Sequence, residues 1–397
     1  MIPTRMTRRT FLAAGSSALF VPGLPAATDR PRRVAVIGHT GRGNYGHGLD
    51  VVWQKIPGAE IVGVADADEK GLKSALARLK IKRGFKDYRE MLPELRPEFV
   101  SIAPRHPDQH LEMALAAIEA GAKGLYVEKP FCRTPAEADQ LIKAADQRGV
   151  RIAVAHRNRY HPALPSIDRL IGDDTIGRLL EIRGHGLGDR RGGGEDLWVL
   201  GSHIFNLFHY FGGEPKSCSG ILLQNGNPVT GKDVVKGAEG LGLLAGNEIH
   251  ARWHLSKGLI GSYTTFADDG SNKAGYAAHL IGTKGAISIH IDRDPVAWLS
   301  PGNPFDPASR NKTRIPITLA GLDKKETRPE LIASVHNHVL AIRDLIDAVD
   351  HNRAPLCDAR QGAVVVEMIC GVFESHRQNG AHVPFPLVER ENPLSKL

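Results

Sequence analysis

The chain has 397 residues, enough for two domains with separate cores, and a modest net charge of +7. Its basic residues are spread along the chain rather than gathered in a patch interleaved with aromatics, so we expect no nucleic-acid partner. No apolar run approaches the length of a membrane span, so we expect no membrane insertion of the mature chain. Abundant glycine and few aromatics suit an α/β protein.

The first 29 residues resemble an export signal. Arg8-Arg9 precede Phe11-Leu12, a weakly apolar run covers 13–21, and a segment rich in Pro and Ala follows. The paired arginines resemble those of twin-arginine signals. We expect residues 1–29 to be a signal peptide and linker, the twin-arginine export machinery to be a partner, and the mature protein to be periplasmic or otherwise exported. A disordered basic tail is the alternative.

The first element of the folded chain is a short buried strand, Val34–Ile37, which runs into a glycine-rich turn and then a segment that can start a helix. The backbone N–H groups of such a junction are suited to a diphosphate. In the spacing G-x-G-x-x-G, Thr40 takes the second glycine's place. Either the next glycine replaces it by a one-residue shift, or the Thr40 hydroxyl bonds a phosphate. The cofactor-binding residues predicted here are Gly38, Thr40, Gly41, Arg42 and Gly43.

A second apolar strand, 60–65, ends in Asp66. Asp66 follows the glycines at about the sequence separation expected for an acid that binds the ribose hydroxyls of a dinucleotide. Because a carboxylate would repel a ribose 2′-phosphate, the sequence favours NAD over NADP. A structural strand–helix turn without a ligand is the alternative.

Strands and helices then alternate up to residue 156. Helices are predicted at 87–95, 110–120 and 136–148, and strands at 99–103, 125–127 and 151–155. This pattern predicts an α/β domain, a Rossmann doubly wound parallel sheet over residues 30–156, with ligands at the carboxyl ends of its strands. Pro104, the run Glu128-Lys129-Pro130 and His156 fall at those ends.

From residue 157 onward, strands follow one another instead. They are predicted at 179–184, 217–223, 248–255, 259–266, 277–282 and 286–291, with a long helix at 331–349 and another at 361–377. We expect an α+β domain over residues 157–397, built on a large open, mostly antiparallel sheet, and a homo-oligomer. The four cysteines are too widely spaced for a disulfide framework, so buried free thiols are expected. His106 and His110 have no acidic companion, and we expect no metal.

Four segments together resemble the glucose–fructose oxidoreductase / inositol dehydrogenase / MocA (Gfo/Idh/MocA) family. They are Ser101–Pro104 followed by His110, then Glu128-Lys129-Pro130, Arg159-Tyr160-His161-Pro162 and Gly201-Ser202-His203. The resemblance covers nearly the whole chain after the signal. It implies an NAD(P)-dependent oxidoreductase acting on a sugar, sugar acid or cyclitol. The roles it implies are acid/base for Lys129, active-site histidine for His203, nucleotide contacts for Pro104, His106 and Glu128, and substrate contacts for Arg159, Tyr160 and His203.

The chemistry of these residue types agrees with those roles. A lysine beside a positively charged nicotinamide has a lowered pKa and can accept a hydroxyl proton, and a histidine titrates near neutrality. Many dehydrogenases of the family carry an Asp four residues before the histidine, where this chain has Val199; Glu195 and Asp196 are candidates to replace it. Arg190 and Arg191 either clamp an anionic group of the substrate or belong to a solvated loop.

Two other functions stay open. One is an NAD-dependent glycoside-cleaving enzyme that works through transient oxidation, and the other is a non-catalytic sugar-binding homologue. Because an exported enzyme meets little free NAD, we expect a tightly bound nucleotide and a redox-neutral cycle. The arm at 29–33 is a candidate to cover the adenosine and diphosphate.

Overall fold

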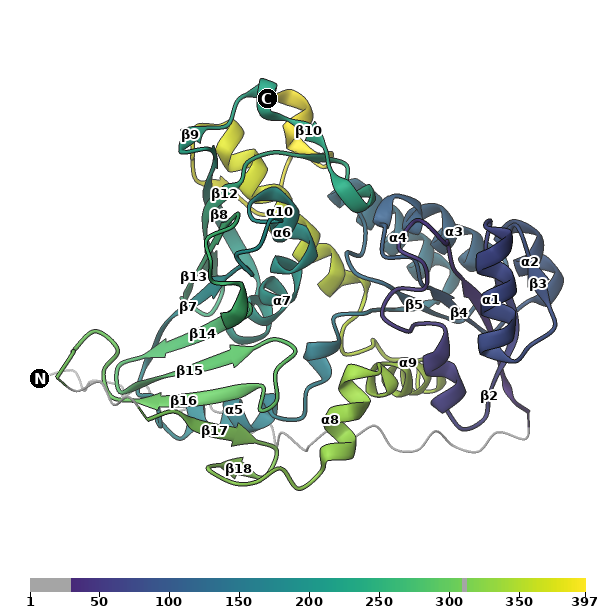
Figure 1. Cartoon of the computed structure of the whole chain (residues 1–397), viewed down its shortest axis with the longest axis horizontal. Coiled ribbons are helices and arrows are strands. Elements are labelled where there is room, and N and C mark those ends of the chain that lie inside the picture. The colour runs from purple at the N-terminus through teal and green to yellow at the C-terminus, as the bar shows by residue number, and fades with distance from the viewer. Residues whose placement is uncertain (1–29, 309–312) are drawn as a thin grey trace, which may run out of the picture.

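The structure is a computed structural model that describes residues 30–308 and 313–397. The predicted signal peptide lies outside the described residues. The described chain forms two sheets set side by side, the first from the N-terminal third and the second from the middle of the chain (Figure 1).

The first sheet is parallel and has six strands in the order β3-β2-β1-β4-β5-β6, which confirms the predicted doubly wound fold. Four helices connect or cover its strands. The strands are β1 (Arg32–Ile37), β2 (Ala59–Ala65), β3 (Gly84–Phe85), β4 (Phe99–Ile102), β5 (Gly124–Val127) and β6 (Arg151–Val154), and the helices are α1 (Glu69–Leu79), α2 (Tyr88–Leu95), α3 (His110–Glu119) and α4 (Pro135–Arg148). The strand order reverses between β1 and β4, so the ligand-binding crevice is expected at their carboxyl ends.

The segment after β1 differs from the prediction. It forms a series of turns and then a five-residue 3-10 helix, η1 (Val51–Lys55), instead of an α-helix. Gly41, Gly43, Gly46 and Gly48 all have positive φ, at 85°, 86°, 59° and 89°, and this backbone cannot continue a right-handed helix. An anion at this edge would therefore meet the N–H groups of turns rather than the dipole of a long helix.

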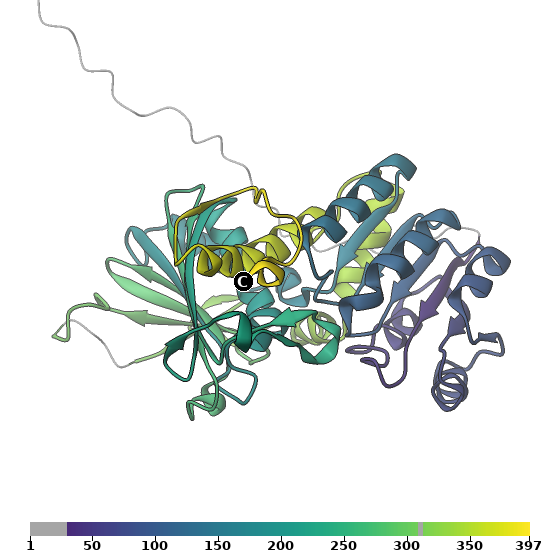
Figure 2. The same cartoon turned by 90° about the horizontal axis from the view of Figure 1, so that it is seen from above.

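The second sheet has eleven strands, and all its pairs are antiparallel except β7 with β13. Its strands are β7 (Leu179–His185), β8 (Pro215–Gln224), β9 (Asn227–Pro228), β12 (Glu248–Leu255), β13 (Ile260–Phe266), β14 (Ala277–Gly282), β15 (Gly285–His290), β16 (Ala297–Pro301), β17 (Ile315–Thr318), β18 (Gly321–Leu322) and β19 (Val383–Pro384). Helices α7 (Gly201–Gly212) and α10 (Ala359–Arg377) pack on the face turned toward the first domain (Figure 2). The predicted open, mostly antiparallel sheet is confirmed.

The prediction of a single helix at 331–349 is wrong. The chain forms α8 (Pro329–His336) and α9 (Val339–Asp350), which are separated at His338, where φ is +64°. The His338 ring contacts the Tyr126 hydroxyl of β5 at 2.6 Å, and α9 packs against β5 and β6. The break therefore brings the late part of the chain back onto the first sheet.

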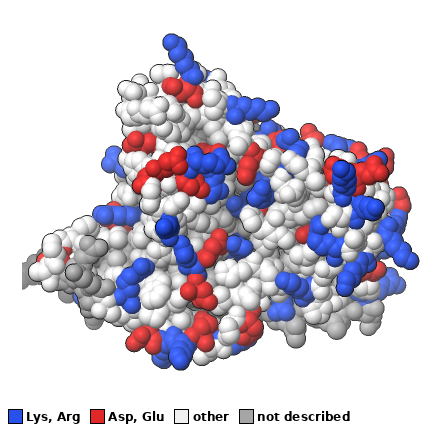
Figure 3. Space-filling view, in the orientation of Figure 1, with Lys and Arg blue, Asp and Glu red and all other residues white. Residues whose placement is uncertain are grey.

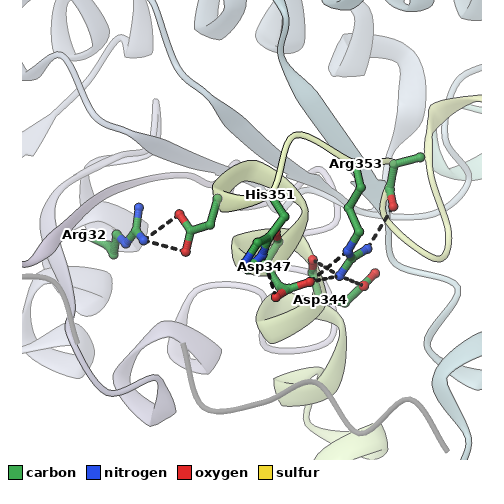
Figure 4. A network of polar contacts seen from close by, with 7 residues as sticks. Arg32, Asp344, Asp347, His351 and Arg353 are labelled. Atoms are coloured by element: carbon green, nitrogen blue, oxygen red, sulfur yellow. Dashed lines mark hydrogen bonds and ion pairs between the residues drawn. The ribbon is translucent and has the colours of Figure 1, made fainter. Parts of the chain in front are cut away.

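The amino-terminal edge of the first sheet is fixed by an ion pair. Arg32, at the start of β1, donates to both carboxylate oxygens of Asp350 at 2.6 and 2.7 Å, beside the contacts of Arg353 with α9 (Figure 4). Gly38 follows the opposite, carboxyl end of β1, so the whole length of this strand separates it from Arg32. The described part of the arm, residues 30–33, thus lies at the wrong end of β1 to cover a nucleotide, contrary to the prediction.

All four cysteines are buried and free, as predicted. Over residues 30–308 and 313–397, no helix combines the length and apolarity that crossing a membrane requires. On the face shown in Figure 3, basic and acidic side chains are interspersed and neither sign forms a broad patch.

Candidate active site

Asp66 and Thr40 hold the glycine-rich turn against the end of β2. The Asp66 carboxylate is 1% exposed and accepts hydrogen bonds from the Thr40 N–H at 3.1 Å, the Thr40 hydroxyl at 2.7 Å and the Asp68 N–H at 3.0 Å. In this arrangement the Thr40 hydroxyl braces the acid, and a phosphate contact from the same hydroxyl stays a prediction.

An open cavity of about 480 Å³ lies beside this acid. Its walls combine glycine backbone, apolar side chains, two carboxylates and basic side chains; they include Gly38, Ala65, Asp66, Lys86, Asp87, Tyr88, Arg89 and Met113. The glycine backbone, the apolar side chains and the Asp66 carboxylate suit an adenosine. A Cβ on Gly38 would lie 2.2 Å from the Tyr45 ring, and one on Gly43 would lie 2.3 Å from the Arg105 backbone nitrogen. Only glycine fits at these two turns, and the described residues are consistent with a bound dinucleotide.

Loops after β4 and β5 meet behind this turn through His110. Its Nε2 lies 2.7 Å from the Pro104 carbonyl and its Nδ1 lies 3.1 Å from the Phe131 carbonyl. The His110 ring is fully buried, so its role is to tie the two loops together. His106 lies in the same loop, and its buried Nδ1 has no hydrogen-bond partner among the described residues.

Glu128 is fully buried at the end of β5. Burial raises the pKa of its carboxyl, but the hydrogen bond and charge of His47 outweigh this and lower the pKa to about 2. Glu128 also accepts from the Lys129 N–H at 3.0 Å. A permanent negative charge therefore stands beside the predicted acid/base lysine.

Lys129 follows Glu128 and is only 6% exposed. Its ammonium donates to the Val199 carbonyl at 2.9 Å. Burial lowers the pKa of Lys129, which favours the neutral amine that can accept a proton. The side chain lines an open cavity of about 630 Å³ between the two domains.

His203, at the start of α7, lines the same cavity. Burial lowers the pKa of His203 well below its ordinary value, and its buried Nδ1 has no hydrogen-bond partner among the described residues. Behind it stands His156, with the two ring centroids 5.6 Å apart. Burial lowers the pKa of His156 to about 3, and its Nδ1 lies 3.8 Å from Cys357 Sγ. Both rings are therefore neutral near pH 7.

Neither acid near Val199 replaces the missing Asp. Asp196 is fully buried and accepts from the Tyr263 hydroxyl at 2.7 Å, on the second sheet. Glu195 is half-buried and does not line the cavity. The ammonium of Lys129 instead finds the backbone carbonyl of Val199.

Only some of the predicted substrate-binding residues line the cavity. Arg191 lines the cavity and donates to Asp189 at 2.7 Å, and Arg190 is exposed outside it. Arg159 stacks on the Tyr210 ring at 4.1 Å, and Tyr160 is buried with its hydroxyl 3.2 Å from Asp344. Arg159 and Tyr160 thus pack beside the cavity rather than along it.

Several residues that line the cavity were not predicted as site residues from the sequence: His47, Arg105, Arg157, Glu239, Tyr276, Asp292 and His338. They come from turns and strand ends far apart in the chain. None belongs to a spaced motif. Two have a local signal: Arg105 lies between the predicted nucleotide contacts Pro104 and His106, and Arg157 comes three residues after the end of β6. No group of three or more His, Cys, Asp or Glu within the described ranges is arranged to hold a metal ion.

A hairpin of the second domain reaches across to the nucleotide loops. It consists of β10 (Val235–Lys236), η5 (Ala238–Gly240) and β11 (Leu243–Leu244), and its tip extends toward the first domain in both views (Figures 1 and 2). Glu239 faces Arg105 at 4.0 Å. A Cβ on Gly240 would lie 2.6 Å from Asp108, the acid that pairs with Arg42 of the glycine-rich turn.

These two domains define a class of protein, a dinucleotide-binding enzyme whose second domain completes the cavity around Lys129. Residues 32–156 match the oxidoreductase family with the NAD-binding Rossmann fold, and residues 171–385 match that family's C-terminal alpha/beta domain. The chain therefore belongs to the glucose–fructose oxidoreductase / inositol dehydrogenase / MocA family, and its nucleotide is NAD.

Relatives in this family are named sugar dehydrogenases. The chain is 35% identical to D-apiose dehydrogenase of Paraburkholderia graminis over 32% of this chain and 33% of that protein. It is 26% identical to levoglucosan dehydrogenase of Pseudarthrobacter phenanthrenivorans over 58% of this chain and 65% of that protein. The chain thus spans less than two thirds of either relative. A solved levoglucosan dehydrogenase in complex with NADH and levoglucosan has the same fold, with a TM-score of 0.70 at 20% identity over 90% of this chain and 100% of that one.

Proposed function

We propose that the protein oxidises or reduces a hydroxyl carbon of a sugar, sugar acid or cyclitol, with NAD as the hydride carrier. One observation carries the proposal: the buried amine of Lys129 and the neutral imidazole of His203 line the same cavity between the domains, with the neutral His156 ring behind His203. When bound, NAD supplies a hydride acceptor. Gly38, Gly43 and Asp66 would hold it, and the cavity over Lys129 would hold the carbohydrate.

In this proposal, Lys129 accepts the hydroxyl proton during oxidation and returns it during reduction. The Val199 carbonyl fixes the position of Nζ without neutralising it, since a carbonyl is a hydrogen-bond acceptor with no net charge. His203 orients the same hydroxyl or shares its proton. Both side chains are largely buried, which limits the access of water to them.

We also propose that the nucleotide stays bound between turnovers. The hairpin 235–244 supports this, since its tip packs on the two loops that would surround the diphosphate. A retained nucleotide favours a redox-neutral cycle, either paired conversion of two sugars or glycoside cleavage through transient oxidation. Such a cycle suits an exported enzyme, and the twin-arginine-type signal at 1–29 supports export to the periplasm.

A homo-oligomer is proposed as well. Polar side chains alternate along the outward face of β12, at His250, Arg252 and His254, while the intervening residues are buried. Such a half-polar sheet face is suited to contact with a second copy. Light scattering after gel filtration measures the mass, and a monomer at micromolar concentration would refute this part of the proposal.

The experiment is a screen of sugars and glycosides that follows nicotinamide absorbance and bond cleavage in parallel, before and after extensive dialysis. Deuterium on the oxidised carbon reports where the hydride goes. Its appearance in a second sugar supports exchange, and its return to a cleaved product supports the glycoside-cleaving cycle. Stoichiometric release of NADH, with activity wholly dependent on added NAD, would leave an ordinary dehydrogenase. No oxidation and no cleavage of any compound would overturn the proposed function.

A further inference from the structure

The cavity wall carries both basic and acidic side chains. Three arginines line it, and each faces a carboxylate: Arg157 with Asp292 at 2.7 Å, Arg191 with Asp189 at 2.7 Å and Arg105 with Glu239 at 4.0 Å. Only two acids line the described cavity, Glu239 and Asp292. Each of these arginines therefore already has a carboxylate partner, which weakens its attraction for an anionic substrate.

Asp292 is the better placed of these two acids. One carboxylate oxygen accepts from the Arg157 guanidinium at 2.7 Å, and the other accepts from the Tyr276 hydroxyl at 3.2 Å. A carboxylate has about four acceptor sites, so two remain free. The Asp292 side chain is 39% exposed, and it lines the cavity. The carboxylate therefore has acceptor sites available to a substrate in this cavity.

The backbone presents this carboxylate from a turn. Asp292 lies between β15 and β16, at a turn directed toward the first domain (Figure 1), and has φ of +60°. Asp tolerates this left-handed conformation better than most residues. Across the cavity, the Tyr276 ring lies 6.2 Å from the His203 ring. The carboxylate is thus held by two rigid partners on the wall that the second domain contributes.

We infer that Asp292 is a substrate-binding residue that accepts hydrogen bonds from hydroxyl groups, and that the cavity selects a neutral sugar or cyclitol over a sugar acid. This inference rests on the proposed function. A hydroxyl donates to a carboxylate in a charge-assisted hydrogen bond, whereas a substrate carboxylate at the same wall would be repelled. Position 199 carries no acid in this chain, and Asp292 supplies a negative acceptor from another element.

The test compares Asp292→Asn with a matched control, Asp174→Asn. Asp174 also has a positive φ, +59°, and pairs with Lys284, but it lies outside the cavity. Asn tolerates the same backbone, so both variants keep the turn. Calorimetry with the NADH-loaded proteins measures the binding of neutral sugars, cyclitols and the matching uronic acids, independently of turnover.

For Asp292→Asn, we expect the affinity for the best neutral ligand to fall at least about tenfold, the value of one charge-assisted hydrogen bond. Affinity for the uronic acids should rise, because Arg157 loses its counter-charge. Asp174→Asn should match the wild type. Unchanged neutral-sugar affinity in Asp292→Asn, a wild-type preference for the acids, or no sugar binding to the wild type would each overturn the inference. Sugar binding without turnover would instead count against the proposed function alone.

Discussion

The ammonium of Lys129 and the backbone carbonyl of Val199 form a hydrogen bond of 2.9 Å across the interface of the two domains. The lysine comes from the end of β5 and the carbonyl from the end of helix α6 (Gly194–Val199), 70 residues later. The contact holds a buried amine in place without giving it a counter-charge. Burial lowers the pKa of Lys129 and outweighs the opposing effect of the neighbouring carboxylates, of which Glu128 is the largest. A lowered pKa is what the proposed role as proton acceptor requires.

Replacing Lys129 by Ala should lower turnover at least about a hundredfold, the usual contribution of a positioned acid–base group. Because burial lowers the pKa of Lys129 from 10.5, kcat/KM for oxidation by the wild type should rise with pH and level off below pH 10.5. Steady-state kinetics across pH measure both effects. The control is Lys123→Ala, a mostly exposed lysine that pairs with Glu98. Retained activity with normal nucleotide binding in Lys129→Ala would make this lysine structural.

Replacing Gly240 by Ala should speed release of NADH at least about tenfold, equivalent to about 1.4 kcal/mol. Its Cβ would lie 2.6 Å from Asp108 and push the hairpin away from the nucleotide loops. Gly242→Ala is the control, because Gly242 also has a positive φ, +87°, but has no atom within 4 Å of the added Cβ. Stopped-flow fluorescence gives the release rates. Equal rates in the two variants would show that the hairpin does not retain the nucleotide.

Mass spectrometry of the denatured wild-type protein should detect NAD rather than NADP, because the buried carboxylate of Asp66 would repel a 2′-phosphate. The Gly240→Ala protein should lose this nucleotide on dialysis. A wild-type preparation that neither carries nor binds a nicotinamide dinucleotide would contradict the assignment of the glycine-rich turn.

Acid should destabilise the protein through its buried neutral histidines. Burial lowers the pKa of His161 to about 3, and its Nδ1 accepts the Ala163 N–H at 3.2 Å. The unfolded chain takes up a proton near pH 6.5, whereas native His161 stays neutral down to about pH 3. Stability is therefore lost as the pH falls between these values, by about 2 kcal/mol at pH 5 for this residue. Urea unfolding of His161→Asn should show a smaller loss between pH 7 and pH 5 than the wild type. Identical losses would mean that His161 is protonated in the native state.

Replacing Arg8 and Arg9 together by Lys should trap the precursor in the cytoplasm, because the signal resembles one that is read through its paired arginines. Fractionation of cells that express each form measures the distribution. Normal export of the double variant would contradict the twin-arginine assignment.

The sequence by itself determined the elements whose pattern is local. The residue pattern predicted β12 and β14 with the bounds that the structure has. In β12 the pattern alternates, because a strand that faces a core on one side repeats every two residues. Asp66 and Lys129 each follow a predicted apolar strand, so the sequence predicts both residues at one edge of the parallel sheet. Chain order was enough there, because the carboxyl ends of parallel strands meet at the same edge.

Only the tertiary structure decided what those motifs meet. At the break, His338 contacts Tyr126, which is 212 residues away in the chain, and no local pattern predicts that contact. Asp292 and Tyr276 reach the cavity from separate turns of the second sheet, and no spacing in the chain connects them with Lys129. A hydrogen bond depends on distance in space, and the packing of the two domains sets that distance.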